Sequence, residues 1–274
     1  MLPGSTVANL TALWAAREAG CTEVVSSTRS HLSIRKSAHL LGLRHRAVEH
    51  WHDPGTLDRS AVVLTAGQTS TGEIEPLDAA PAARWRHVDA AWAGPLRFSD
   101  RHGHRLDGIE DADSVAVSAH KWLFQPKESA LVLFADSASA HASISLDATY
   151  LAVPNVGLLG SHGAVAAPLL ATLLAYGRRG IAAVIDHSMA LADQLFALVD
   201  AHDALVARSA PQSGVVLWRH ANRPTAAVVA ALPADVVLST TTLDRLAWLR
   251  SVAANPMADP ASIVDAVVAA GASA

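Results

Sequence analysis

The sequence predicts an α/β protein, with a parallel or mixed sheet in its first part and a smaller α+β domain after it. Short apolar runs alternate with helical patterns along the first 134 residues, as parallel and mixed sheets require. The pattern then changes to two long helical stretches, Gly163–Tyr176 and Ile181–Ala201, separated by a Gly-Arg-Arg-Gly break. The chain is long enough to bury one large core or two smaller ones. We therefore expect a large domain over residues 1–177 and a small domain over residues 178–274.

Each expected element follows from hydrophobic periodicity and from the residues that flank it. The apolar residues of Thr6–Ala19 form one stripe at helical spacing, and Gly20 ends this helix. A second helix is expected over Ser33–Leu41, closed by Gly42, and a last one over Pro260–Ala270. Strands are expected at Glu23–Ser26, Ala61–Thr65, Trp85–Val88, Ser114–Val117, Ala130–Phe134, Gly214–Trp218 and around Val236–Ser239.

Composition excludes several classes of function. The formal net charge is −4 and neither sign runs in long blocks, so we expect no nucleic-acid or membrane partner. Cys21 is the only cysteine, which rules out an internal disulfide and favours a reducing, cytoplasmic setting. No uninterrupted apolar run reaches the roughly 20 residues that span a bilayer. The scattered loop histidines have no cysteine companions, and we expect no metal site.

Chemistry-bearing residues follow the ends of the expected strands. Lys121 comes after the strand Ser114–Val117, where ligands of α/β sheets bind, and an amine in a partly apolar site can form a Schiff base with an aldehyde. Asp89 ends another strand, where a carboxylate could keep a pyridine nitrogen protonated. The segment Thr65–Gly72 is rich in hydroxyl groups. Taken singly, each feature also fits a structural role.

As an ordered set, these segments resemble the group II pyridoxal-5′-phosphate (PLP) decarboxylases, which have the aspartate aminotransferase fold, fold type I. The helix start Gly4–Leu10 is similar to the family's phosphate-binding turn and implies cofactor contacts from Ser5 and Thr6. Ser27–Ser33 resembles the segment whose histidine stacks on the pyridine ring, which implies His31. Thr65–Gly72 resembles the segment whose threonine, here Thr69, approaches the other ring face.

The same resemblance implies roles for four residues nearer the middle of the chain. Asp89 would pair with the pyridinium nitrogen and Ala91 would pack on the ring. His120 and Lys121 match the family's histidine–lysine pair, and Lys121 would form the internal aldimine. Trp122 adjoins Lys121 and is expected to wall the pocket. The implied fold is a PLP-dependent transferase-like large domain with a mixed, seven-stranded-type sheet, followed by a small C-terminal α+β domain.

The later part of the chain resembles the family less closely. Leu159–Ile181 is similar to a landmark of tyrosine or aspartate decarboxylases and sphingosine-phosphate lyases, although this chain has His162 where they usually carry arginine. Trp248–Val252 resembles a late strand whose arginine, here Arg250, can meet a substrate carboxylate. We expect both His162 and Arg250 to contact substrate. Tyr150 is the one tyrosine in the stretch where the family has a mobile catalytic loop.

The resemblance predicts a lyase of amino-acid metabolism, namely an amino-acid decarboxylase that acts through a Lys121 Schiff base and a quinonoid intermediate, with His31, Asp89 and His120 assisting. A PLP-dependent carbon–carbon lyase or another elimination enzyme would use the same residues. A catalytically weak partner subunit is a further alternative. We expect a homodimer that binds a small amino acid. The family's N-terminal segment is missing here, so the sequence is a fragment, another chain supplies that wall, or the pocket is remodelled.

Overall fold

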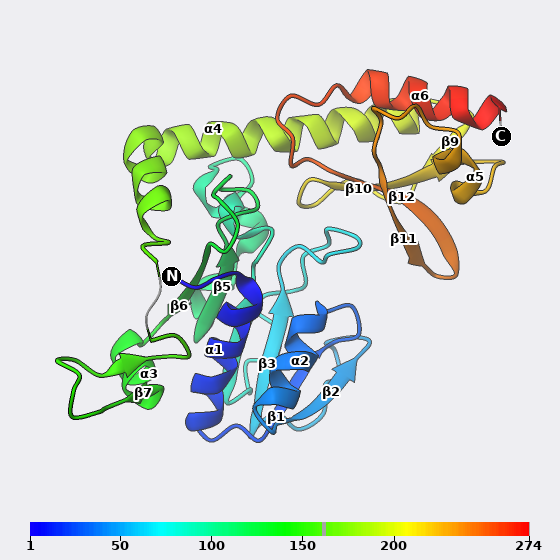
Figure 1. The fold of residues 1–274 in the computed structure, drawn as a ribbon. Coiled ribbons are helices and arrows are strands. Elements are labelled where there is room, and N and C mark those ends of the chain that lie inside the picture. The colour runs from blue at the N-terminus through cyan, green and yellow to red at the C-terminus, as the bar shows by residue number, and fades with distance from the viewer. Residues whose placement is uncertain (161–162, 274) are drawn as a thin grey trace. The chain divides into compact units, whose positions relative to one another are not determined.

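The computed structural model describes residues 1–160 and 163–273 (Figure 1). These residues form two compact units. The first consists of Met1–Thr69 and Ile74–Ile181, and the second of Ser70–Glu73 and Ala182–Ala274. Each unit has its own sheet, so the chain divides as an α/β part followed by an α+β part.

A six-stranded sheet forms the centre of the first unit. Its strand order is β2-β1-β3-β4-β5-β6, in which β1 to β5 run parallel and β6 runs antiparallel to β5. The strands are β1 (Glu23–Ser27), β2 (Arg44–Val48), β3 (Ser60–Thr65), β4 (Trp85–Asp89), β5 (Ser114–Ser118) and β6 (Ala130–Phe134). The other elements are α1 (Ser5–Glu18), α2 (Leu32–Leu40), α3 (Ser137–Ser143), the hairpin β7 (Ser145–Leu146) with β8 (Asn155–Val156), and the 3₁₀ turns η1 (Gly94–Phe98), η2 (Gly103–Leu106) and η3 (Ile109–Asp111).

The predicted seven-stranded-type sheet is corrected to six strands within the part of the chain that the structure describes. Leu2 pairs with Ala130 at the β6 edge through two backbone hydrogen bonds of 2.8 Å, but a single bridge does not make a strand. Strand β2 went unpredicted because its sequence, Arg-His-Arg-Ala-Val, lacks a continuous apolar run. As an edge strand it needs none, since its side chains lie at or near the surface.

Apolar side chains of α1 and α2 pack against β1 and β3. Leu13 from α1 and Ile34 from α2 are fully buried there, together with Val24 and Val63 from the strands. Cys21 belongs to the same core, and burial raises the pKa of its thiol to about 11. The thiol therefore stays protonated at neutral pH and acts as a packing group.

The parallel strands bring their carboxyl ends to one edge of the sheet. On the neighbouring strands β4 and β5, Asp89 pairs with Ala116, so the segments that follow Asp89 and Ser118 leave the sheet side by side. On β3, Thr65 pairs with Asp89, which places the loop after β3 next to them. Ligands of open α/β sheets bind outside this edge.

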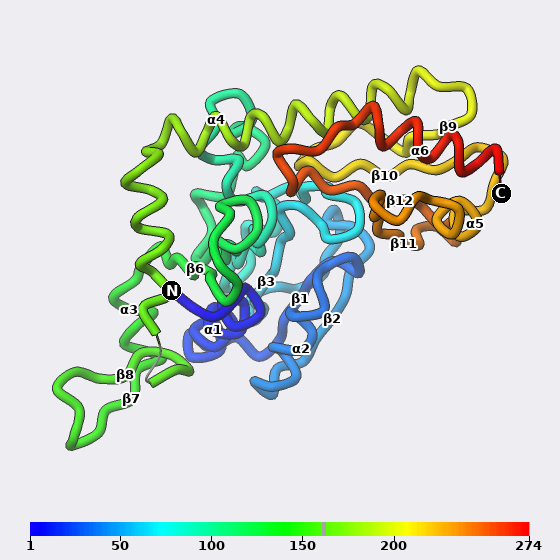
Figure 2. Tube along the Cα trace, turned by 45° about the horizontal axis from the view of Figure 1, so that its top comes forward, coloured from blue at the N-terminus to red at the C-terminus, as the bar shows by residue number. Residues whose placement is uncertain are grey.

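The second unit has a four-stranded antiparallel sheet covered by helices. The strand order is β11-β12-β10-β9, and Figures 1 and 2 show α6 and the later part of α4 lying together along the sheet. Their apolar residues form one core with Trp218, which is fully buried. The elements are α4 (Ala167–Asp200), β9 (Leu205–Ala207), β10 (Val215–His220), α5 (Thr225–Ala230), β11 (Ser239–Leu243), β12 (Leu246–Val252) and α6 (Pro260–Ser273).

One strand prediction in this unit is misplaced. The strand expected around Val236–Ser239 begins at Ser239 instead, because Pro233 and Val236 close a turn through a backbone hydrogen bond of 3.0 Å. The other strands and helices predicted from periodicity are confirmed within a few residues, apart from the boundary between the two long helical stretches. These run as α4, with a kink at Gly177, whose φ of 59° is left-handed.

Helix α4 is long and apolar enough to cross a membrane by length and composition alone. That test is weak, because core helices of water-soluble proteins pass it too. The helix changes direction at Gly177, and Ala192, Leu195 and Val199 of its later part are buried in the core of the second unit. This packing accounts for the apolar composition of the later part.

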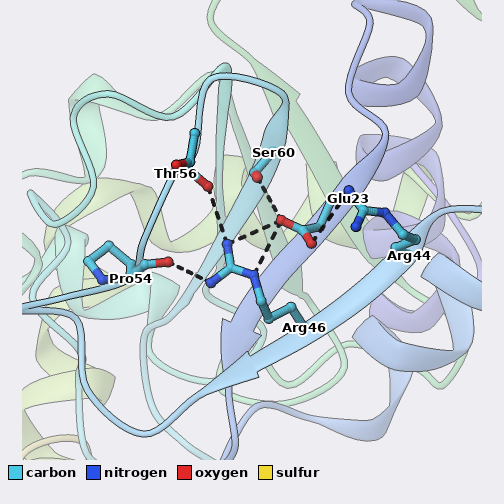
Figure 3. Close-up of polar contacts among 6 residues, drawn as sticks. All are labelled: Glu23, Arg44, Arg46, Pro54, Thr56 and Ser60. Atoms are coloured by element: carbon cyan, nitrogen blue, oxygen red, sulfur yellow. Dashed lines mark hydrogen bonds and ion pairs between the residues drawn. The ribbon is translucent and has the colours of Figure 1, made fainter.

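A polar cluster lies at the opposite, amino end of the parallel strands (Figure 3). Glu23 at the start of β1 accepts hydrogen bonds from Arg46 Nη2 at 3.1 Å and from Ser60 Oγ at 3.0 Å. Arg46 also donates to the carbonyls of Pro54 and Thr56, which ties the loop before β3 to the sheet. Burial by itself raises the pKa of Glu23, but these hydrogen bonds and the arginine charges outweigh it and hold the pKa below 4.5. The cluster links β1, β2 and the start of β3 at the end of the sheet opposite to the one that precedes the Asp89 and Lys121 segments.

We expect Glu23→Gln to lower the free energy of unfolding by about 1–2 kcal/mol at pH 7, because the amide loses the charge-assisted bonds to Arg46. The folded pKa of Glu23 lies below its unfolded value, so its stabilisation is complete above that value and is lost as the pH falls through the folded pKa. Urea unfolding of wild type and variant should thus converge in acid. Glu49→Gln, at an exposed position, is the control, and a pH-independent gap between wild type and Glu23→Gln would contradict the assignment.

Candidate active site

Asp89 lies buried at the carboxyl end of β4. Its side chain is held by two donors: the backbone N–H of Ala91 donates to Oδ1 at 3.2 Å, and Asn9 Nδ2 donates to Oδ2 at 3.0 Å. Asp89 is 3% exposed, so these bonds replace much of the water that a carboxylate would otherwise bind. The sequence places a carboxylate at this strand end, and the structure fixes its orientation.

Asn9 reaches Asp89 from the inner face of α1 and continues to a buried histidine. Its Oδ1 lies 3.0 Å from Nε2 of His87, which belongs to β4, two residues before Asp89. On the other side of the ring, Nδ1 of His87 lies 2.9 Å from Ser114 Oγ on β5. His87 is fully buried, and burial lowers its pKa to about 4. The ring is therefore neutral at physiological pH.

His31 is fixed at the start of α2. It is the N-cap of the helix: the backbone N–H of Ser33 donates to its Nδ1 at 3.2 Å, and Ser33 Oγ lies 2.8 Å from the same nitrogen. Asn9 Nδ2 also donates to Ser33 Oγ at 3.0 Å. The ring predicted to stack on a cofactor is thus joined through Ser33 and Asn9 to the predicted ring-nitrogen partner Asp89.

Lys121 and His120 lie in the turn after β5, which the backbone bond from Lys121 N–H to Ser118 C=O helps to close. Lys121 is half-buried. Nδ1 of His120 donates to the carbonyl of Ser129 at 3.0 Å, so its Nε2 is the ring nitrogen left to accept a proton. Burial lowers the pKa of His120 below its ordinary value, and the charges of Lys121 and Lys127 lower it further, against the Ser129 bond.

The start of α1 lies beside His120. A Cβ placed on Gly4 would be 3.8 Å from His120 Cε1, so the glycine N-cap and the histidine are neighbours. Gly4 has a φ of 102°, which favours glycine, and no side chain caps the first turn in the described structure. Ser5 and Thr6 form that turn, which carries no acidic residue. A helix start of this kind suits an anion such as phosphate.

Aromatic packing connects the loops that follow β3, β4 and β5. Trp92 follows β4 and Trp122 follows Lys121, and their ring centroids are 4.4 Å apart. Gly67, after β3, approaches Trp92 so closely that a Cβ would lie 2.9 Å from its Cδ1. Gly67 also has a φ of 89°, so a side chain here meets both backbone strain and a clash. The three loops therefore pack against one another, and a role for Trp122 in walling the pocket stays a prediction.

The predicted cofactor residue Thr69 is exposed in the loop after β3. A buried carboxyl shapes that loop: Glu75 accepts from the backbone N–H of Thr65 at 2.9 Å and from Gln68 Nε2 at 3.0 Å. Burial raises the pKa of Glu75, although these bonds oppose it. Thr69 is thus carried by a braced loop at the same sheet edge as Asp89.

The roles predicted for Arg250, His162 and Tyr150 are not tested by the contacts at this edge. Arg250 lies on β12 in the second unit, where burial lowers the pKa of its guanidinium, and its role toward substrate stays a prediction. His162 lies outside the described residues. Tyr150 is 86% exposed between β7 and β8, and Figure 1 shows that hairpin away from the carboxyl end of β3. A catalytic role for Tyr150 in this conformation has no structural support.

Several residues of the site were not singled out from the sequence. Asn9, Ser33, His87 and Ser114 are all buried and belong to the polar network around Asp89. One signal was available for Asn9, because an amide on the apolar stripe of a helix needs a buried partner. His87 had no comparable signal, since a histidine in a strand is common at the surface as well.

The donors and acceptors at this edge fit PLP. A helix start that suits an anion, a buried carboxylate, a histidine ring and an amine lie on four segments far apart in sequence, which Asn9 and the Gly4–His120 contact connect in part. Two buried hydroxyl oxygens at the same strand ends, Thr65 Oγ1 and Ser118 Oγ, have no hydrogen-bond partner among the described residues. Buried polar atoms normally have partners, so these oxygens suit a site that takes a polar ligand. No group of three potential metal ligands occurs in the described ranges.

Comparison with known proteins identifies the family. The family model of the pyridoxal-dependent decarboxylase conserved domain matches residues 2–220, which is most of the chain. The L-2,4-diaminobutyrate decarboxylase of Rhizobium meliloti (strain 1021) is 32% identical, over 94% of this chain and 62% of its own length. The chain belongs to the pyridoxal-dependent decarboxylase family. It also resembles the aspartate 1-decarboxylase of Aliivibrio fischeri (strain ATCC 700601 / ES114), at 27% identity over 79% of this chain and 50% of that protein.

Solved structures show the same fold. Mouse CSAD in its apo form has a TM-score of 0.84 at 23% identity, covering 99% of this chain and 71% of its own. A sphingosine-1-phosphate lyase of Burkholderia pseudomallei K96243 reaches 0.82 at 20% identity, covering 98% and 69%. The predicted fold class is confirmed. The chain spans about half to six tenths of the length of these curated relatives.

Proposed function

We propose that this chain carries the catalytic site of a PLP-dependent amino-acid decarboxylase, a carboxy-lyase. The observation that carries the proposal is the buried Asp89 carboxylate, oriented by Asn9 at a strand end adjacent to the Lys121 turn. When bound, PLP supplies an electron sink for negative charge that develops at the substrate's α-carbon. Asp89 would hold the cofactor's ring nitrogen protonated, and that charge is what makes the ring a strong electron sink.

The other predicted residues would bind and orient the cofactor. The first turn of α1, with Ser5 and Thr6, would hold the phosphate. His31 would pack on the ring, because its capping bond at α2 fixes the imidazole plane. Thr69 and Ala91 would lie at the ring from the loops after β3 and β4, and the Lys121 amine would be the point of covalent attachment.

Proton movement falls to the turn after β5. His120 Nε2 is the nitrogen left to accept, since Nδ1 donates to Ser129, and the lowered pKa keeps that nitrogen unprotonated at neutral pH. The proton for the substrate carbon would come from the substrate's own ammonium group: the Lys121 amine would take it up when substrate binds and would deliver it after CO₂ leaves, directly or through His120 Nε2. The substrate class is a small amino acid whose carboxylate Arg250 and His162 would bind.

A carbon–carbon lyase or elimination enzyme is the second candidate, and a specific observation supports it: the sphingosine-1-phosphate lyase fold matches this chain nearly as well as that of CSAD. The fold alone therefore does not select the bond that breaks. A catalytically weak partner subunit is the third reading. The sequence matches to decarboxylases, which cover up to 94% of the chain, favour decarboxylation.

A single buried cysteine supports a reducing, cytoplasmic setting.

Cofactor attachment provides the first test. PLP mixed with the protein and reduced with borohydride should become linked to Lys121, and Lys121→Ala should lose the visible absorbance of the bound cofactor. Lys127→Ala, at an exposed lysine six residues later, is the matched control and should keep it. A reduced adduct mapped to Lys36 or Lys127 would refute the assignment.

Reaction type provides the second test. Wild-type protein supplied with a panel of amino acids should release CO₂, whereas keto acids or aldehydes without CO₂ would favour the lyase or transaminase alternative. Asp89→Asn should still bind PLP but should lose turnover by roughly 100-fold or more, because a neutral amide cannot hold the ring nitrogen protonated. Equal turnover in Asp89→Asn would show that this residue does not perform that role.

Assembly provides the third test. Leu170, Leu174 and Tyr176 on α4 are 57%, 77% and 60% exposed. An apolar cavity of about 340 Å³, lined mainly by η1, β5, β6 and α4, lies in the same unit. Such surfaces mark association sites, and two-fold dimers are the commonest soluble oligomers. We expect light scattering to give a dimer that dissociates on dilution, whereas a monomer at every concentration with full activity would contradict this. A chain supplying the family's N-terminal segment is the alternative partner.

A further inference from the structure

Asn9 is the centre of the buried network and both of its amide hydrogens are used. Nδ2 donates to Asp89 Oδ2 and to Ser33 Oγ, each at 3.0 Å. An ionised carboxylate can only accept, so the Asn9 atom that faces Asp89 must be the nitrogen. The amide oxygen must then face His87, 3.0 Å away, where it can only accept.

The position of the His87 proton follows from this geometry. Because the amide oxygen accepts, Nε2 of His87 must donate, and the neutral ring then accepts at Nδ1 from Ser114 Oγ. Ser114 Oγ in turn accepts from Trp85 Nε1 at 2.8 Å. In the chain of hydrogen bonds that runs from Trp85 through Ser114, His87 and Asn9 to Asp89, each bond then has one donor and one acceptor. Full burial keeps the ring neutral, as the pKa of about 4 indicates.

The opposite arrangement is electrostatically unfavourable. Nδ1 of His87 also lies 3.2 Å from the carbonyl of Ser114, to which it would donate in the other tautomer. Nε2 would then accept from Asn9, whose amide would have to rotate and turn its oxygen toward Asp89. Two acceptors, Asn9 Oδ1 and Asp89 Oδ2, would then face each other across 3.0 Å in a buried site, and the loss of the donor to Oδ2 is costly.

We propose that His87 is a positioning residue for Asp89: its Nε2–H locks the Asn9 amide in the one orientation that donates to the carboxylate. His87 touches neither cofactor nor substrate in this scheme and carries no charge. The inference rests on the proposed role of Asp89 toward the cofactor nitrogen. It also places His31 under the same control, since the second Asn9 hydrogen reaches Ser33, whose hydroxyl donates to His31 Nδ1.

The proton positions can be tested without any cofactor. Long-range ¹H–¹⁵N spectra of the histidine rings should show His87 as a neutral ring protonated at Nε2 from pH 8 down to about 5, because burial disfavours its charged form. The resonance is assigned by its absence from the spectrum of His87→Gln. A ring protonated at Nδ1 would overturn the inference.

Two variants distinguish the effect of the His87 Nε2–H donor from the effect of the ring's volume. His87→Gln can place an amide N–H near the position of Nε2, whereas His87→Leu has no donor. With PLP labelled at the ring nitrogen, the ¹⁵N shift of wild type and His87→Gln should report a protonated nitrogen. In His87→Leu the ¹⁵N shift of the PLP ring nitrogen should move toward the value of an unprotonated nitrogen. PLP should also bind about tenfold more weakly, which corresponds to a loss of about 1.4 kcal/mol of binding free energy. Circular dichroism checks that each variant is folded.

The outcomes distinguish this inference from the proposed function. If wild type holds PLP with a protonated ring nitrogen and folded His87→Leu leaves that shift and the affinity unchanged, the positioning role is wrong and the proposed function stands. If wild type binds no PLP, the proposed function fails, and the cofactor-free spectra still decide the His87 proton. If His87→Leu does not fold, the test rests on His87→Gln, which keeps a donor near the position of Nε2. Loss of the proton from the PLP ring nitrogen in folded His87→Gln would then contradict the positioning role of His87.

Discussion

The hydrogen bond between Asn9 and Asp89 is the contact on which the candidate site depends. It joins α1 to the end of β4 and gives a buried carboxylate a donor that water no longer supplies. The same amide reaches the start of α2 through Ser33, so one side chain sets the relative positions of a helix start, a strand end and a histidine ring. Because α1 also carries Gly4 beside His120, the helix start predicted to bind phosphate lies next to the turn that carries Lys121.

The polar side chains at the two ends of the parallel sheet differ in their contacts. At the amino end, Arg46 donates hydrogen bonds to Glu23 and to two loop carbonyls. These contacts have a structural role, because they hold the loop before β3 against the sheet. At the carboxyl end, polar side chains follow three neighbouring strands, and some buried hydroxyl oxygens such as Ser118 Oγ have no partner in the described structure. This division follows from parallel pairing, which brings the ends of all strands to one edge and the starts to the other.

The fold does not by itself choose a reaction. A decarboxylase relative and a lyase of the same fold both match nearly the whole chain, so the bond that breaks must depend on how the substrate carboxylate is held. We expect residues that contact the substrate to make that choice, and Arg250 stays a prediction for this role. The residues predicted to bind the cofactor lie on the first unit and would serve either reaction, so they indicate the family and do not identify the substrate.

The sequence by itself determined the α/β class, most strands and helices, and the residues at the strand ends, because periodicity and order along the chain carry that information. It also predicted that Asp89 ends a strand and that Lys121 follows one, as the structure has them, while the roles of Asp89, His31 and Lys121 toward a cofactor stay predictions. It did not determine β2, whose exposed edge position removes the apolar signal, or the place of β11. Nor did it determine the roles of Asn9, His87 and Ser114. Their hydrogen bonds span 24 to 80 positions, and only tertiary packing decides which buried donor meets which acceptor.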